Sequence, residues 1–579
     1  MTGSIVLLAA AIVLPDSPTA VERSAADELR AAVVRMTGEE LPVVAEREAV
    51  PGTNFLVGAT REARRLVPPE AWKPDEILVG PVGSSVVLTG HPTRGPLYSV
   101  DVYLEDVCGV RWWTSTEADY PKLSELPRPS ALLRHAPPFA YRETYYLDGF
   151  DPVFKVRSKG NFSSRTRYMF HPLRYVPRER GGDHRLYFFE GRGSAYHSFF
   201  ETLPPKVHFA AHPDWYSEIG GRRVAKQLCL TNEEMTRAYV EETLRRLRTE
   251  PDVDFISVSQ NDWDGACQCE KCRAVIAEEG ETSGLYLRFA NRVAEAVERE
   301  FPSVRIDTFA YRFTRRPPKR TRPRHNVAVR LCDIECAFNA PIATSGLDDD
   351  FLRDLKAWGK IAAGRLFVWD YTTDFVSYMM PHPNVSSLGE NVRLFARSGA
   401  VGVFEQGDAL CSAGSFAALE HWMLAHLLWN PDRDATRLRD EFIRGYYGPS
   451  AAPHVRRCRE IVDGAGLAAA RRGVKVGCYH LTVTNFMDKA TALDAAAAID
   501  RAVDAARVDG ACHVRRVLRE KLSFDHMKLV CWKDWELPGS RVDAIRRWIS
   551  DCRSFGVEAW REDVRREDLE TYFEMMRGL

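Results

Sequence analysis

Short apolar runs of strand character alternate with helical stretches between residues 136 and 430, and this alternation constrains the fold more than any other feature. Such alternation is typical of a parallel sheet with helical crossovers. Eight strand-like runs over about 290 residues predict a (β/α)8 TIM-type barrel. The runs are residues 139–146, 194–200, 224–231, 255–262, 305–313, 327–336, 365–372 and 400–408. One crossover helix is predicted from a capping-box pattern, Thr231 to Glu234, followed by apolar residues as far as Leu247.

The flanking segments predict two further domains. A chain of 579 residues exceeds the size of a single hydrophobic core. Residues 1–135 predict a small α/β domain, with a helix in "VERSAADELRAAVVRMTG" and strands at 54–58, 76–80 and 85–90. The proline-rich stretch 127–138 predicts a linker, and the alanine-rich residues 431–579 predict a helical domain without visible chemistry. The predicted class is therefore α/β, with domains 1–135, 136–430 and 431–579.

Charge and hydropathy argue against nucleic-acid and membrane partners. Lys and Arg number 79 against 80 Asp and Glu, so no general field attracts polyanions. The basic run 313–325 contains prolines and predicts a solvated loop. "SIVLLAAAIVLP" resembles a signal-peptide core, but no basic residue precedes it, and a buried strand explains it better. We expect a soluble chain without a recognisable targeting signal. The sequence does not determine its cellular compartment.

Acidic and aromatic side chains follow several of the predicted strands. Barrel enzymes build their active sites from the carboxyl ends of strands and the loops that follow. Hydrolysis of a glycosidic bond needs one carboxylic acid to protonate the leaving oxygen, and a second group that attacks, activates water or stabilises the cationic transition state. Acids at several strand ends, beside Trp, Tyr and Asn, favour this reaction. They include Asp262, Asp333, Glu335, Asp370, Glu405 and Asp408.

Two stretches near residue 136 resemble known carbohydrate-active enzymes. "GHPTRGPLYSVDVYLEDVCGVRWW" is similar to the segment that closes the N-terminal domain of family 20 hexosaminidases and family 67 α-glucuronidases. Those enzymes place a small α/β domain before a catalytic barrel. "PPFAYRETYY" resembles the first barrel strand of the hexosaminidases, where an arginine binds the sugar. This resemblance implies that Arg142 binds substrate.

The middle of the chain resembles a narrower group. "AHPDWYSEIGGRR", "QLCLTN", "SVSQNDWDGACQCEKC", "RLCDIEC", "WDYTTDF" and "GVFEQG" occur in the order found in domain-of-unknown-function family 4838. Part of that family is classified as glycoside hydrolase family 163, which are endo-β-N-acetylglucosaminidases. The resemblance implies a retaining hydrolase that acts on a β-N-acetylglucosaminide or related glycan with two carboxylates, and substrate assistance is one form that this mechanism takes. We expect no cofactor and no catalytic metal, because no obvious set of histidine ligands accompanies the cysteines.

The catalytic residues follow from this resemblance with one departure. The hexosaminidases end their fourth strand with an adjacent Asp-Glu pair, whereas this chain has Asn261-Asp262. We expect Asp262 to act with Glu335, and Glu405 is the reserve partner. The expected substrate-binding residues, besides Arg142, are His197, Asn261, Trp263, Trp369, Asp370, Tyr371 and Tyr378.

Three cysteines follow Asp262 closely. Cys267, Cys269 and Cys272 supply three of the four ligands that structural zinc requires. Cys229, Cys332 and Cys336, near other strand ends, are candidates for the fourth. Zinc, a disulfide and packed free thiols all remain open. In each case we expect the cluster to hold the loop that presents Asp262.

Two other functions compete with the glucosaminidase. A uronidase would need basic residues for the substrate carboxylate, and Arg312 and Arg330 are available. A non-catalytic carbohydrate-binding barrel is the alternative outside enzymes, because the Asp-Glu pair is absent. The acids at separate strand ends favour an enzyme.

Overall fold

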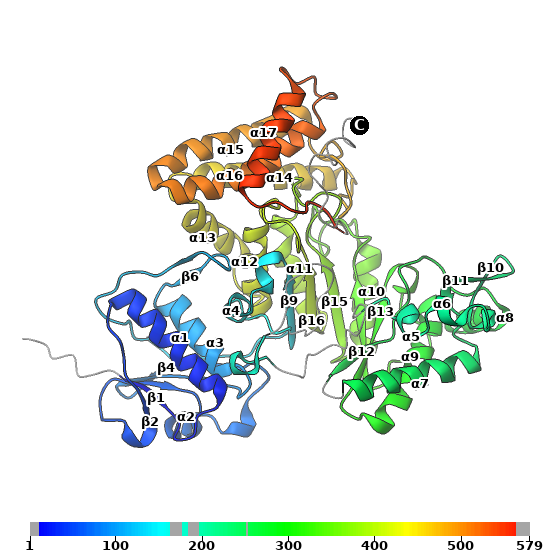
Figure 1. The fold of residues 1–579 in the computed structure, drawn as a ribbon, viewed down its shortest axis with the longest axis horizontal. Coiled ribbons are helices and arrows are strands. Elements are labelled where there is room, and N and C mark those ends of the chain that lie inside the picture. Colours follow the sequence, from blue (N-terminus) through cyan, green and yellow to red (C-terminus); the bar gives the residue numbers. More distant parts are fainter. Residues whose placement is uncertain (1–10, 163–175, 183–195, 251–252, 563–579) are drawn as a thin grey trace, which may run out of the picture. The chain divides into compact units, whose positions relative to one another are not determined.

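The computed structural model describes residues 11–162, 176–182, 196–250 and 253–562 (Figure 1). This part of the chain divides into two compact units. The first unit contains residues 11–142, 148–162 and 176–182, and the second contains residues 143–147 and everything described from 196 onward. Within the described residues, no helix combines the length and apolarity needed to cross a membrane. The domain boundaries at residues 135 and 430 stay predictions.

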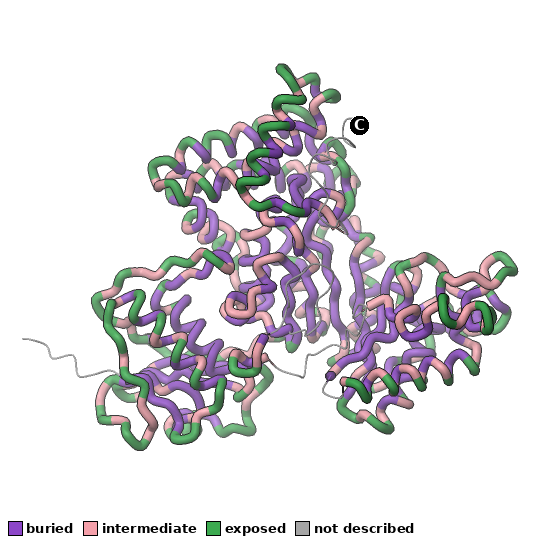
Figure 2. The backbone as a smooth tube through the Cα atoms, viewed as in Figure 1, coloured by how far each residue is buried: buried purple, intermediate pink, exposed green. Residues whose placement is uncertain are grey.

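The first unit is built on a six-stranded mixed sheet with the strand order β2-β1-β3-β5-β4-β8. β1, β2, β3 and β5 run parallel, and β4 is antiparallel to both β5 and β8. Figure 2 shows the buried centre of this unit. The strands are β1 (Ile12–Leu14), β2 (Val43–Ala45), β3 (Phe55–Val57), β4 (Ile77–Val82), β5 (Ser85–Gly90) and β8 (Leu133–His135).

The predicted first helix is confirmed as α1 (Ala20–Thr37). Thr19 and Glu22 form a capping box at its start, and Gly38 ends it in the left-handed conformation at φ 80°. The predicted strands at 54–58, 76–80 and 85–90 are also present, as is a helix, α3 (Gly95–Val102). The proline-rich stretch is more than a linker, because β8 within it pairs with β4 and forms an edge of the sheet.

The second unit contains a curved sheet with the order β12-β13-β14-β15-β16-β9. The five strands from β12 to β16 are parallel neighbours in sequence order, which confirms the α/β class. The strands are β9 (Tyr141–Tyr145), β12 (Phe255–Ser257), β13 (Arg305–Ala310), β14 (Val327–Cys332), β15 (Leu366–Tyr371) and β16 (Ala400–Gln406). In the described residues this is a half-barrel of six strands.

Two of the eight predicted barrel strands do not join this sheet. Residues 224–231 belong largely to β11 (Arg222–Leu228), which forms an antiparallel hairpin with β10 (Tyr216–Ile219). The cause is the turn Gly220-Gly221, because both residues have positive φ, 57° and 76°, as tight hairpins require. Of the run 194–200, the first two positions lie outside the described residues, and α5 (Phe199–Thr202) begins where a strand was expected.

Helices connect most consecutive strands of the second unit, although β13 and β14 are joined without an α-helix. The helices are α7 (Glu233–Thr249), α8 (Glu270–Glu279), α9 (Thr282–Glu300), α10 (Asp349–Ile361), α11 (Val385–Arg397) and α12 (Ala417–Trp429). The predicted cap of α7 was misplaced by one residue. Asn232, rather than Thr231, accepts the capping hydrogen bond from the Met235 amide. This leaves the hydroxyl of Thr231 available for another contact.

The C-terminal part of the second unit is helical, as the composition predicts. Its helices are α13 (Ala435–Tyr447), α14 (Ala452–Arg471), α15 (Lys489–Asp509), α16 (Ala511–Val530) and α17 (Arg541–Ser554). Helices α14, α15 and α16 pack side by side (Figure 1). Small alanine side chains on α15 permit this close packing, and those at 492, 495, 498 and 502 are fully buried.

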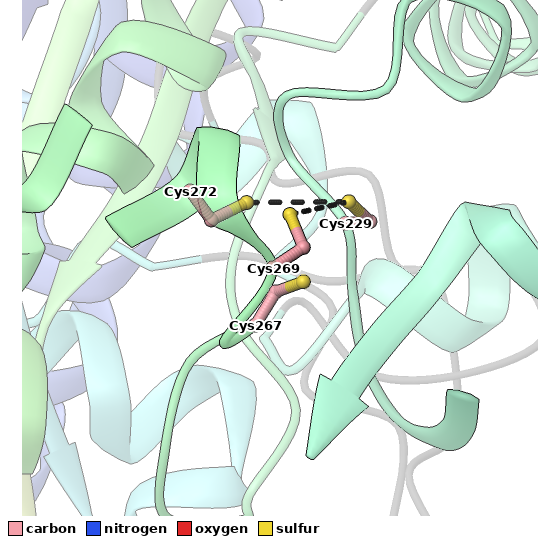
Figure 3. Close-up of side chains that lie close together, drawn as sticks. All are labelled: Cys229, Cys267, Cys269 and Cys272. Carbon is pink, nitrogen blue, oxygen red and sulfur yellow. Dashed lines mark hydrogen bonds between the residues drawn. The ribbon is translucent and has the colours of Figure 1, made fainter. Parts of the chain in front are cut away.

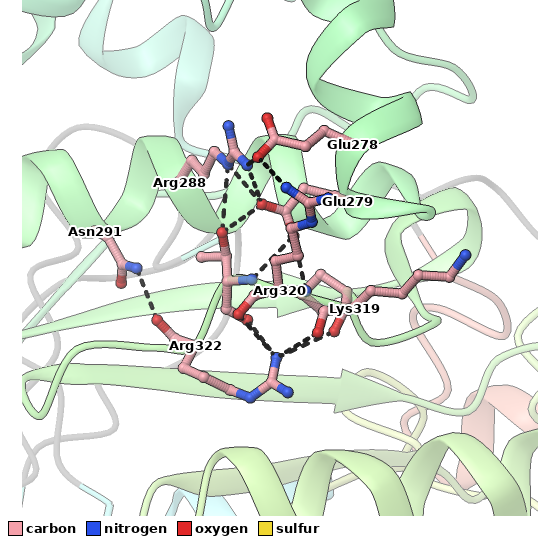
Figure 4. A network of polar contacts seen from close by, with 9 residues as sticks. Glu278, Glu279, Arg288, Asn291, Lys319, Arg320 and Arg322 are labelled. Carbon is pink, nitrogen blue, oxygen red and sulfur yellow. Dashed lines mark hydrogen bonds and ion pairs between the residues drawn. The ribbon is translucent and has the colours of Figure 1, made fainter.

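The basic run 313–325 is held by acidic residues of α8 (Figure 4). The buried carboxylate of Glu279 accepts hydrogen bonds from the Arg320 and Thr321 amides at 3.2 and 2.9 Å. It also accepts one from the Arg288 guanidinium at 2.6 Å. Burial opposes ionisation, but these hydrogen bonds outweigh it and lower the pKa of Glu279 to about 2. The run is therefore an anchored loop whose charges are partly paired.

Candidate active site

A cavity of about 320 Å³ lies in the second unit, where the strands of the curved sheet end. Side chains from the ends of β9, β15 and β16 line it, together with loop residues that follow β12, β13 and β14. This position matches the expected location of an active site in a barrel-like fold. The lining residues are Tyr145, Tyr196, His197, Asp262, Tyr311, Ile334, Trp369, Tyr371, Tyr378, Phe404, Gln406, Ala409, Leu410, Tyr479 and Glu562.

Aromatic rings form most of the wall. The Trp369 ring lies 4.5 Å from that of Phe404 and 4.9 Å from that of Tyr196, with which it makes an edge contact. The indole nitrogen donates to Gln406 Oε1 at 2.8 Å, so the ring is fixed in orientation. Fixed aromatic faces with nearby hydrogen-bonding groups suit the apolar faces and hydroxyls of a sugar ring.

Asp262 contributes a carboxylate to this cavity, as the sequence predicts for a catalytic residue. The Tyr311 hydroxyl donates to its Oδ1 at 3.2 Å. The backbone before and after Asp262 is held by the Gln227 side chain. Gln227 Nε2 donates hydrogen bonds to the carbonyls of Asn261 and Trp263 at 2.8 and 2.9 Å. Asp262 thus combines an exposed side chain with a fixed backbone.

Glu562 is a second carboxylate in the cavity, and sequence reasoning missed it. Gln406 Nε2 donates to its Oε1, and the Tyr479 hydroxyl donates to its Oε2, each at 2.9 Å. Tyr479 and Glu562 lie in loops after α14 and α17, in the region expected to carry no chemistry. No periodicity or motif marks Glu562, so only the folded chain reveals it.

His197 lines the cavity and has an unusual backbone conformation. Its φ is 55°, in the left-handed region that non-glycine residues seldom adopt. Its Nδ1 lies 2.7 Å from the Gln260 carbonyl oxygen, which fixes the ring. Burial lowers the pKa of His197 below its ordinary value, so the neutral imidazole is favoured at pH 7. Backbone strain of this kind clusters at functional sites.

Arg142 occupies a different environment from the one the resemblance implies. It belongs to the first unit, where its guanidinium pairs with Asp75 at 2.8 Å and donates to the Lys159 carbonyl at 2.9 Å. Arg94 pairs with the other oxygen of Asp75 at 2.7 Å. Burial would raise the pKa of Asp75, but the two arginine charges outweigh it and hold that pKa well below normal. Arg142 is not among the described residues that line the cavity.

Glu335 and Glu405, the expected partners of Asp262, are also outside the described lining. Glu335 pairs with Arg315 at 2.9 Å, and its side chain is 49% exposed. Glu405 is fully buried and lies in register with Asp370 of the neighbouring strand. Side chains alternate between the faces of a strand. Because Trp369, Tyr371, Phe404 and Gln406 face the cavity, Asp370 and Glu405 face the other way.

Asp370 and Glu405 form a buried acidic cluster with Asp333. Burial raises the pKa of Asp370 to about 6. Burial and then the charge of Asp370 raise the pKa values of Asp333 and Glu405 well above their ordinary range. Like charges at short range in a dry environment favour shared protons. Asp370, predicted to bind substrate, therefore lies behind the cavity wall and outside the described lining.

The remaining predicted residues divide between cavity and scaffold. Trp369, Tyr371 and Tyr378 line the cavity, as the binding prediction requires. Asn261 is engaged in the scaffold, since its Oδ1 accepts from the Phe200 amide at 3.2 Å. The Trp263 ring lies beside Lys226, whose ammonium is 5.6 Å from the ring centre.

The two arginines proposed for a uronidase are occupied elsewhere. Arg330 is buried, pairs with Asp307 at 3.2 Å and lies over the Trp369 ring at 5.5 Å. Arg312 forms an ion pair with Asp264. Neither is among the described residues that line the cavity.

The three cysteines of the loop after Asp262 lie close to a fourth cysteine. Cys229 joins Cys267, Cys269 and Cys272, and all four sulfur atoms lie within 4.8 Å of one another. Cys332 and Cys336, the other candidates for a fourth ligand, are buried separately. This cluster lies apart from the described lining of the cavity.

Comparison with solved structures identifies similar folds. A family 89 glycoside hydrolase from Clostridium perfringens, in complex with 2-acetamido-1,2-dideoxynojirmycin, has a TM-score of 0.51 and 11% sequence identity. The match covers 92% of this chain and 65% of that chain. A doubly substituted form of the same hydrolase, in complex with its substrate GlcNAc-alpha-1,4-galactose, has a TM-score of 0.50 at 10% identity, with 96% and 69% covered. At such identities the likeness establishes fold alone.

Sequence comparisons supply the family. No curated protein matches the chain. The family model described as "Domain of unknown function (DUF4838)" matches residues 112–460, which is more than half of the 579 residues. That span includes all six described strands of the curved sheet and all of the described cavity-lining residues except Tyr479 and Glu562. This protein belongs to the DUF4838 family.

Proposed function

We propose that this chain is a glycoside hydrolase that cleaves a β-N-acetylglucosaminide or a related glycan. The observation that carries the proposal is the pairing of Asp262 and Glu562 in one aromatic-walled cavity. Glycosidases need two carboxyl groups that face a bound sugar, and aromatic rings that hold it. The likeness of the fold to glycoside hydrolases supports the same class, and the N-acetylglucosamine unit in a neighbour's substrate supports the sugar.

The surroundings of the two acids suggest a division of roles. Glu562 accepts hydrogen bonds from Gln406 and Tyr479, which orient its carboxylate and stabilise its negative charge. We assign it to the stabilisation of the cationic transition state or, in a substrate-assisted reaction, to the orientation of the 2-acetamido group. Asp262 accepts one hydrogen bond, from Tyr311, and is assigned to proton transfer with the leaving oxygen.

This assignment replaces Glu335 with Glu562 as the partner of Asp262. Glu335 is held by Arg315, whereas Glu562 reaches the cavity itself. The two pairings make opposite predictions for single substitutions. Glu562→Gln should abolish most activity if Glu562 is the partner, and Glu335→Gln should do so if the sequence-based pairing holds.

The test is hydrolysis of aryl β-N-acetylglucosaminide, aryl α-N-acetylglucosaminide, aryl glucuronide and N-glycan substrates. We expect cleavage of an N-acetylglucosaminide, with losses of about 10³-fold or more in kcat for Asp262→Asn and Glu562→Gln. Glu335→Gln should stay near wild type, and thermal unfolding verifies that each variant is folded. The anomeric form of the first product, followed by NMR, tests retention.

Other outcomes would redirect the proposal. Cleavage of the glucuronide alone would favour the uronidase. Binding of glycans without any turnover would favour a non-catalytic carbohydrate-binding protein. Full activity in both acid variants would refute the assignment of the pair.

A further inference from the structure

We propose that Cys229, Cys267, Cys269 and Cys272 bind one structural zinc ion. The sulfur of Cys229 lies 3.7 Å from that of Cys269 and 4.0 Å from that of Cys272. In a tetrahedral site with Zn–S bonds of about 2.3 Å, neighbouring sulfurs are separated by about 3.8 Å. Figure 3 shows the four side chains converging from opposite segments onto a shared centre. Their spacing therefore matches the edges of a zinc–thiolate tetrahedron.

The surroundings of the cluster are those of a closed, structural site. The four residues are between 0 and 9% exposed. Four thiolates complete the coordination of zinc, so no position remains for water or substrate. Thiolate sulfur also selects zinc or iron over the hard cations that prefer oxygen. A structural rather than a catalytic ion follows from this ligand set.

Hydrogen-bond donors surround the sulfurs. The Glu218 amide donates to Cys267 Sγ at 3.3 Å, and the Thr231 hydroxyl lies 3.2 Å from Cys272 Sγ. The Arg223 guanidinium approaches Cys267 Sγ at 3.9 Å. Four thiolates around Zn²⁺ carry a net charge of −2, and donors of this kind stabilise that charge.

The ligands come from two segments that the ion would join. Cys229 follows β11, while Cys267 and Cys269 belong to the loop after Asp262, and Cys272 lies in the first turn of α8. A zinc ion would thus tie the β10–β11 hairpin to the loop that presents Asp262. This matters because the hairpin is not a member of the curved sheet, so it lacks a strand ladder to hold it there.

Metal analysis of the full chain, purified without added metal, tests the proposal directly. We expect about one zinc per chain, released as the four thiols are titrated with a mercurial reagent. Cys229→Ala and Cys272→Ala should reduce bound zinc at least tenfold. Cys458→Ala, at a fully buried cysteine of α14 in the same unit, is the matched control and should retain it.

Two further measurements keep the result decisive if the cysteine variants fail to fold. Replacement of zinc by cobalt(II) in the wild-type chain should produce the visible absorption of a tetrahedral tetrathiolate. Alkylation of the unfolded, unreduced chain should label all 13 cysteines. A disulfide among the four, iron in place of zinc, or wild-type protein that holds no metal after purification and binds none on titration would each overturn the proposal. None of these readouts depends on turnover, so they stand apart from the proposed hydrolase activity.

Discussion

Gln227 and Asn261 exchange two hydrogen bonds between segments 34 residues apart in the sequence. Gln227 Nε2 donates to the Asn261 carbonyl at 2.8 Å, and the Asn261 amide donates back to Gln227 Oε1 at 3.0 Å. The same side-chain amide also donates to the Trp263 carbonyl. One buried glutamine therefore fixes the backbone on both sides of Asp262.

Substitution of Gln227 by Ala should impair the reaction without removing a catalytic group. Without the hydrogen bonds from Gln227 the Asp262 loop can shift. A displacement of about 1 Å can lower the rate by about 10²-fold. We expect kcat for the best substrate to fall by about that factor. Gln268→Ala is the matched control, because Gln268 is an exposed glutamine whose side-chain oxygen accepts a hydrogen bond from the hairpin amide of Gly220 at 2.9 Å. Equal effects of the two substitutions would argue against a positioning role for Gln227.

Tyr479→Phe should weaken catalysis through Glu562. The substitution removes a hydrogen bond to that carboxylate, and a hydrogen bond to a charged group contributes about 1.5–3 kcal/mol. We expect kcat to fall by about 10- to 100-fold with little change in melting temperature, since Tyr479 is exposed. In the Glu562→Gln background the same substitution should have a much smaller effect. Additive losses in the double variant would show that the two residues act independently.

Asp75→Asn should destabilise the first unit strongly. Asp75 is the shared partner of the buried Arg94 and Arg142, and breaking a buried ion pair from one side costs about 3–5 kcal/mol. Urea unfolding followed by fluorescence measures this loss. The control is Asp27→Asn, because Asp27 forms an exposed pair with Arg30 at 3.1 Å, and the expected loss is below about 1 kcal/mol. A loss for Asp75→Asn no larger than the control's would contradict the importance of this network.

The unfolding free energy should depend on pH through the buried acidic cluster of Asp333, Asp370 and Glu405. The pKa of Asp370 is about 6 in the folded chain and about 3.9 when unfolded, so the folded state holds the extra proton. Its contribution to the unfolding free energy is complete below about pH 4 and is lost as pH rises through about 6. Asp370→Asn should remove this decline between pH 4 and 6. Urea unfolding at several pH values checks this, and parallel wild-type and variant curves would contradict it.

Glu279 should give the opposite pH dependence. Its pKa is about 2 in the folded chain, below the ordinary value, so its contribution is present above about pH 4.3 and is lost as pH falls toward 2. Glu279→Gln should lower the unfolding free energy at pH 7 by about 2 kcal/mol, because a buried charged acceptor is lost. The difference from wild type should shrink on acidification. A constant difference from pH 7 to pH 3 would show that the loop is anchored by other contacts.

Much of the fold follows from local patterns in the sequence. The helix over Ala20–Thr37 has both its cap and its glycine stop encoded within about 20 residues, so local chemistry determines it. Five of the parallel strands are short apolar runs bounded by turns, which the period-2 and helical patterns identify. Asp262, Trp369, Tyr371 and Tyr378 line a common cavity because strand ends in such sheets meet at one edge, and their roles there stay predictions.

Tertiary structure decided what local patterns leave open. Strand alternation separates Trp369 from Asp370 and assigns only the former to the cavity, a distinction available only once the register of each strand is known. Arg142 is buried by a pair with Asp75, 67 residues away, and Cys229 reaches the cysteines of another loop only through the β10–β11 hairpin. Glu562 enters the cavity from a C-terminal loop. Such contacts depend on long-range chain closure, and no short stretch of sequence encodes them.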